Sequence, residues 1–104
     1  MNPQEKRKSR RIHIGQPLKI RASDPADVQV KETSTTKNVA REGIYFVSEI
    51  GKYYQGMRVF VTVPYHAPPE PQDREYLGQV ARIEKISDGR WGVAVQFLSE
   101  VRAR

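Results

Sequence analysis

The sequence predicts an all-β fold, a small antiparallel barrel of about six strands, and three observations support it. From Ile12 onward, short runs of β-branched and aromatic residues are separated by Gly, Pro and Asp. No segment carries a helix signal. The chain of 104 residues has room for one domain with a modest core. Closely spaced strands without an intervening helix favour a closed barrel, because closure leaves no exposed strand edge.

Turn-forming residues separate the segments that carry the strand signal. Ser23-Asp24-Pro25 closes the first segment, and a Pro-rich loop is expected over 64–73 because proline removes ladder donors. The Asp88-Gly89 pair predicts a tight hairpin between the last two strands. The expected strands are residues 18–22, 28–36, 43–48, 57–65, 76–86 and 91–98.

Strand alternation assigns side chains to faces. In the last strand, one face is apolar and consists of Trp91, Val93, Val95 and Phe97. Gly92 and Ala94 lie on the other face, where they leave room for a neighbouring strand or a bulky side chain. The only Trp of the chain, on so regular an apolar face, is interpreted as a core residue rather than a platform for stacking bases.

The composition narrows the class of function. The chain has no Cys, which excludes disulfides, thiolate metal sites and a thiol nucleophile. His13 and His66 stand alone, and no catalytic, metal-binding or phosphate-cradling motif is present. We therefore expect a binding module rather than an enzyme, with no metal and no cofactor. Apolar stretches fall far short of the roughly 20 residues that span a bilayer, and no export signal is present, so we expect a cytoplasmic protein.

The positive charge is concentrated at the N-terminus. Residues 1–21 contain seven Lys and Arg but one Glu, so their excess equals the net charge of +6 of the whole chain. Such an excess attracts phosphate, nucleic acid or an acidic membrane, although a solvated basic tail is the alternative. We expect a flexible basic arm over 1–11, a barrel over 12–98, and a short tail over 99–104 that adds at most one helical turn.

Two separated motifs distinguish this chain from other small barrels. The first is Arg7-Lys8-Ser9-Arg10-Arg11, and the second is Asn38-Val39-Ala40-Arg41-Glu42-Gly43, a polar turn in which Gly43 is expected to adopt positive φ. Together with the closing hairpin, they resemble the PilZ domain, the bacterial receptor for cyclic di-GMP. The marks of that family are Arg-x-x-x-Arg and Asp/Asn-x-Ser-x-x-Gly. The resemblance covers about residues 6–98, with Ala40 in place of the family's Ser.

The resemblance implies a cyclic di-GMP site formed by Arg7, Arg11, Asn38, Ala40 and Gly43. By this resemblance, Arg7 and Arg11 lie on an arm that folds over the barrel mouth when the ligand binds. Arginine suits this role because its guanidinium bonds to the O6 and N7 edge of guanine or to phosphate, and also stacks on purines. Asn38 would contact a guanine or hold the turn, and Gly43 would keep the turn close to the ligand. Ala40 lacks one hydroxyl contact.

Three functions follow from these features. The first is a cyclic di-GMP receptor or adaptor that signals through an unidentified protein partner. The second is a barrel that binds no nucleotide and acts only as a protein-interaction module. The third is a small nucleic-acid-binding barrel with the basic arm on phosphates and aromatic side chains on bases, and nucleic acid is the least favoured partner.

Overall fold

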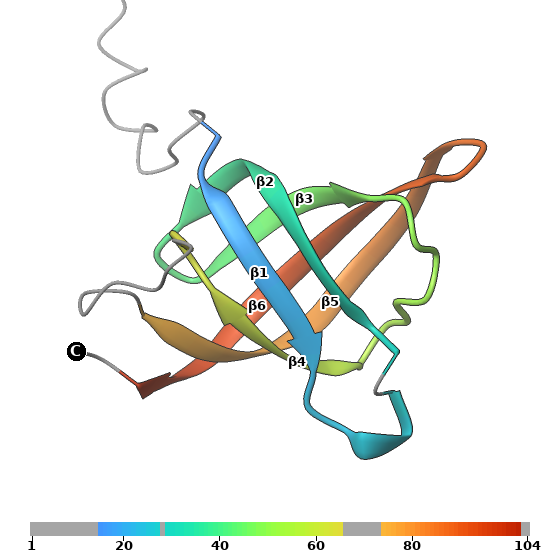
Figure 1. Cartoon of the computed structure of the whole chain (residues 1–104). Helices are drawn as coiled ribbons and strands as arrows, with labels where there is room; N and C mark the ends of the chain where they lie inside the picture. The colour runs from blue at the N-terminus through green and yellow to red at the C-terminus, as the bar shows by residue number, and fades with distance from the viewer. Residues whose placement is uncertain (1–14, 28, 66–73, 103–104) are drawn as a thin grey trace, which may run out of the picture.

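The computed structural model describes residues 15–27, 29–65 and 74–102 and confirms the all-β fold (Figure 1). Six antiparallel strands form a closed barrel in the order β1-β2-β3-β6-β5-β4, and pairing of β1 with β4 completes the closure. A one-turn 3-10 segment, η1 (Pro25–Asp27), follows the predicted turn after the first strand. The strands are β1 (Pro17–Ala22), β2 (Lys31–Ala40), β3 (Gly43–Ser48), β4 (Arg58–Thr62), β5 (Glu75–Ser87) and β6 (Arg90–Arg102).

Two tight hairpins position the later strands. The β5–β6 hairpin turns at Asp88-Gly89, as predicted, and Gly89 has a φ of 75° that suits such a turn. Its tip projects beyond the barrel (Figure 1). The β2–β3 hairpin has a two-residue turn, with Ala40 paired directly to Gly43. The β5–β6 hairpin places β6 beside β5, and β3 pairs with the other edge of β6, so three strands present a continuous outer surface.

The core fills the barrel with side chains from alternate strand positions. In β4, Val59 and Val61 are fully buried, whereas Phe60 is half-buried on the opposite face. Phe46 is the largest fully buried side chain, and its ring meets that of Tyr53 edge-on at 5.7 Å between centroids. The buried hydrophobic residues are Leu18, Ile20, Val30, Ile44, Phe46, Tyr53, Met57, Val59, Val61, Val63, Val80, Val93 and Val95.

A polar cluster lies against one side of this core. The Glu32 carboxylate accepts hydrogen bonds from the hydroxyls of Ser48, at 2.7 Å, and Tyr53, at 2.6 Å. Ser48 Oγ also accepts from the backbone N–H of Ile50 at 3.2 Å. Burial and the adjacent Glu32 carboxylate raise the pKa of Tyr53, so its hydroxyl remains a donor. The cluster therefore ties the segment between β3 and β4 to β2.

We expect Tyr53→Phe to lower the free energy of unfolding by about 1.5 to 3 kcal/mol, because the part-buried Glu32 carboxylate loses one of its two hydroxyl donors. Urea denaturation measures the change. Tyr54→Phe is the matched control, since the Tyr54 hydroxyl also donates to a carboxylate, that of Asp27 at 2.7 Å, but on the exposed surface. Equal losses in the two variants would contradict a stabilising role of the cluster.

β2 and β6 differ most in extent from the sequence-based expectation, and β4 is shorter, covering Arg58–Thr62 rather than 57–65. β2 covers Lys31–Ala40 rather than 28–36, because pairing with β3 continues to the end of the hairpin. β6 runs to Arg102, so residues 99–102 belong to this strand rather than to the separate short tail expected over 99–104. Its last residues instead pair with the start of β5, where Glu75 opposes Arg102 and Leu77 opposes Ser99.

Two residue assignments are also corrected. Gly43 is the first residue of β3 and does not have positive φ, in contrast to Gly51, Gly56 and Gly89. Trp91 is half-buried rather than part of the core. Its ring lies against Gly51, where an added Cβ would approach the ring to 2.6 Å. The segment between β3 and β4 therefore packs against the Trp91 ring.

No helix within the described ranges is long and apolar enough to cross a membrane. The arm expected over 1–11, most of the Pro-rich loop and the last two residues lie outside the described residues.

Candidate functional site

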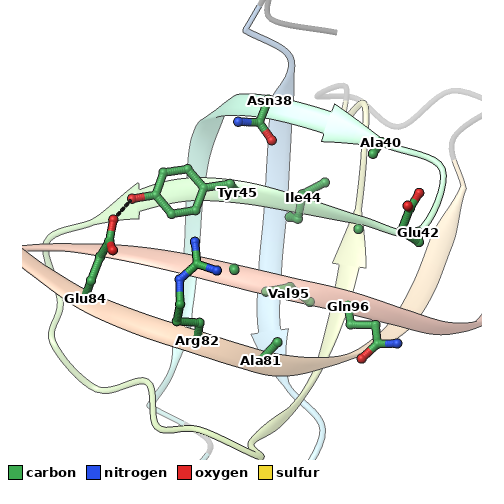
Figure 2. Close-up of a pocket in the computed structure, with 12 residues that line it drawn as sticks. Asn38, Ala40, Glu42, Ile44, Tyr45, Ala81, Arg82, Glu84, Val95 and Gln96 are labelled. Carbon is green, nitrogen blue, oxygen red and sulfur yellow. Dashed lines mark hydrogen bonds between the residues drawn. The ribbon is translucent and has the colours of Figure 1, made fainter. Parts of the chain in front are cut away.

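A pocket of about 580 Å³ lies on the outer surface of β2, β3, β6 and β5 (Figure 2). The order of the strands in the barrel brings the end of the β2–β3 hairpin beside the middle of the β5–β6 hairpin. Its lining comprises Asn38, Ala40, Glu42, Gly43, Ile44, Tyr45, Ala81, Arg82, Glu84, Ala94, Val95 and Gln96. Residues far apart in the sequence thus share one open surface.

Small residues form the base of this pocket. Ala40 and Gly43 come from the β2–β3 hairpin, whereas Ala81 and Ala94 come from β5 and β6. A Cβ at Gly43 would collide with the carbonyl oxygen of Val95. Glycine is therefore required here by the close approach of two strands, and not by its freedom in φ. The resulting shallow base leaves space for a flat ligand against the sheet.

Tyr45 and Glu84 form one end of the pocket. The Tyr45 hydroxyl donates to the Glu84 carboxylate at 2.8 Å, which joins β3 to β5 across β6. The Tyr45 ring lies over Gly92, where an added Cβ would collide with the hydroxyl. The space predicted beside Gly92 is therefore filled by a bulky side chain. Partial burial and the hydrogen bond to Glu84 raise the pKa of Tyr45, which keeps this hydroxyl protonated.

Polar side chains surround the base of the pocket. Arg82 extends from β5 toward Tyr45, and the amide of Asn38 lies above the same surface on β2 (Figure 2). Gln96 and Glu42 occupy the opposite end from Tyr45 (Figure 2). These groups include amide donors and acceptors, a carboxylate and a guanidinium. Such a set matches the edges of a purine base, which present both donors and acceptors.

The structure brings together three of the five predicted site residues. Asn38, Ala40 and Gly43 all line the pocket. They do so from strand ends rather than from the polar turn that the sequence predicts, because the turn itself consists of residues 41 and 42. Arg7 and Arg11 lie outside the described residues.

Sequence reasoning missed five polar residues of the pocket, namely Glu42, which lies within the turn motif, and Tyr45, Arg82, Glu84 and Gln96. Tyr45 had a usable signal, since alternation places it on the same face of β3 as Gly43. The three residues of β5 and β6 are recognised only through strand register, in which Tyr45 and Arg82 both oppose Ala94. Within the part of the chain that the structure describes, no group of three or more potential ligands could hold a metal ion.

The fold and the pocket define a β-barrel with an open site on its outer surface, the architecture of a ligand-binding module. The family model of the PilZ domain matches residues 5–104, nearly the whole chain, and the chain belongs to this family. PilZ domains are binding modules of the cyclic di-GMP type rather than enzymes. No curated protein matches the chain.

Proposed function

We propose that this protein is a cyclic di-GMP receptor that acts in the cytoplasm as an adaptor and performs no chemistry on the messenger. The observation that carries the proposal is the pocket of a PilZ domain in which Asn38, Ala40 and Gly43 lie together beside Arg82. A basic arm acting alone, or a barrel surface without a ligand site, would not require these motif residues to lie in one pocket.

The chemistry of the pocket suits one guanine of the messenger. A flat base fits against the small residues Ala40, Gly43 and Ala94. Guanine presents N–H donors on its Watson–Crick edge, for which the Glu42 carboxylate and the Asn38 amide oxygen are acceptors. Arg82 offers a guanidinium for the O6 and N7 edge or for a phosphate oxygen.

The charge of the pocket gives the N-terminal arm a role in binding. Among the lining residues that the structure describes, Arg82 is the only cation, whereas Glu42 and Glu84 are acidic. Cyclic di-GMP carries two phosphodiester charges, which such a lining does not neutralise. We therefore propose that Arg7 and Arg11 supply the missing cations, and that the arm becomes ordered when it closes over the bound messenger.

Calorimetry with the full chain tests the proposal by comparing cyclic di-GMP, GTP and a single-stranded oligonucleotide. We expect saturable binding of cyclic di-GMP and little response to the other two. Oligonucleotide binding with a steep dependence on salt would instead support the nucleic-acid barrel. No binding of any of the three would leave the protein-interaction module as the function.

The Ala40 position gives a quantitative test of the site. We expect Ala40→Ser to tighten cyclic di-GMP binding by roughly two- to tenfold, the scale of one net hydrogen bond of about 0.5 to 1.5 kcal/mol. Titration calorimetry measures the change, with thermal unfolding as the check on the fold. Ala26→Ser is the control, because Ala26 is exposed in η1 and lies outside the pocket. Equal affinity of Ala40→Ser and the parent protein would argue against ligand contact at this position.

A further inference from the structure

A second surface lies across the barrel from the pocket, on β1 and its two neighbours β2 and β4 (Figure 1). Leu18 and Ile20 are fully buried, so the alternate residues Lys19 and Arg21 point outward. Lys31 pairs directly with Arg21, and Arg58 is an exposed residue of β4. We call this surface the basic face and define it by Lys19, Arg21, Lys31 and Arg58.

Aromatic rings hold two cations of the basic face in place. The Arg21 guanidinium carbon lies 4.4 Å from the centroid of the Phe60 ring, and Lys19 Nζ lies 5.6 Å from that of Tyr65. Arg21 also pairs with the Glu75 carboxylate at 3.2 Å, although its side chain remains 46% exposed. The cations are thus positioned before any partner arrives, which lowers the entropy that binding would otherwise cost.

The arrangement includes an unfavourable pair. Arg21 and Lys31 are directly opposite one another on neighbouring strands, and like charges in this position repel. Among the described residues, Glu75 on β5 contributes a carboxylate to this group through its ion pair with Arg21. An anionic partner would relieve the repulsion between the two cations. Charge complementarity therefore indicates a partner with several carboxylates close together.

We propose that the basic face binds an acidic segment of a protein partner. The inference rests on the proposed adaptor function, since it names the kind of partner that the adaptor would contact. Single-stranded nucleic acid fits less well, because it needs open aromatic rings on which bases stack. Here Phe60 and Tyr65 are half-buried, and the cationic groups of the basic face lie over their rings. The exposed Thr33, opposite Lys19, adds a hydroxyl that bonds to carboxylates.

The full chain is titrated with a ten-residue polyglutamate peptide and, separately, with a ten-nucleotide oligo-dT. We expect Lys31→Gln/Arg58→Gln to weaken peptide binding by roughly five- to twentyfold, the effect of two lost charge contacts. Two controls remove the same charge elsewhere: Lys52→Gln/Arg90→Gln on other exposed parts of the barrel, and Lys8→Gln/Arg10→Gln in the arm. Each control should weaken peptide binding by less than about threefold.

The outcomes separate this surface from the messenger site. Equal losses in all three double variants, or a loss confined to the arm variant, would overturn the inference in favour of diffuse attraction. Tighter binding of oligo-dT than of the peptide, weakened by Lys31→Gln/Arg58→Gln, would overturn the choice of partner. Cyclic di-GMP affinity is measured on Lys31→Gln/Arg58→Gln and on Lys52→Gln/Arg90→Gln and should not change, because these four residues lie outside the messenger pocket. If the messenger fails to bind while the peptide pattern holds, the proposed function fails and the basic face stands.

Discussion

Arg7→Ala and Arg11→Ala are each expected to lower the affinity for cyclic di-GMP by roughly 5- to 150-fold. Each substitution would remove a bidentate guanidinium contact to guanine or phosphate worth about 1 to 3 kcal/mol. Glu42 and Glu84 make the pocket lining acidic, so binding of the anionic messenger depends more strongly on these two arginines. Titration calorimetry at fixed salt measures the dissociation constants.

The arm contains its own controls. Lys6→Ala and Lys8→Ala remove the same charge from the same segment without altering Arg-x-x-x-Arg. They should lower the affinity by much less, because a loss of general attraction is screened by salt. Small and equal losses at all four positions would show a diffuse electrostatic tail and would refute a specific arginine site.

Phe46→Ala is expected to lower the free energy of unfolding by about 3 to 5 kcal/mol, a large share of the stability of so small a domain. Phe46 has no exposed surface, and its ring packs edge-on against Tyr53. The substitution leaves a cavity in the middle of the barrel and removes a neighbour of the polar cluster. Urea denaturation with a comparison of m-values measures the loss.

Phe60→Ala is the matched control for this prediction. It removes the same atoms from a half-buried position on the outside of β4, so the loss should be clearly smaller. A comparable loss at the two positions would contradict the inward assignment of Phe46.

The barrel was predictable because its signals are local. Alternation in β4 places Val59 and Val61 on one face and Phe60 on the other, and this pattern is fixed by the geometry of a single strand. The Asp88-Gly89 turn is equally local, since positive φ at Gly89 satisfies the tight hairpin. Neither signal depends on which strand lies alongside.

The polar cluster of Glu32 could not be predicted in this way. Glu32 reaches Ser48 and Tyr53, which lie 16 and 21 residues away in the sequence. In the sequence, an acidic residue in a Thr-rich strand is typical of the solvent-facing side. Only the closed barrel supplies the two hydroxyls that allow a carboxylate to lie against the core.

The pocket likewise contains residues that the sequence predicts and residues that only the fold brings together. Asn38, Ala40 and Gly43 fall within one short motif, so the sequence alone was sufficient to select them and to predict the family. Tyr45 and Glu84 are 39 residues apart, and their hydrogen bond depends on the register of β3, β6 and β5. An irregularity between Val80 and Arg82 shifts that register and places Arg82 opposite Ala94. Local side-chain patterns show which segments are strands. Cross-strand hydrogen bonds and bulges decide which residues of distant strands lie opposite one another.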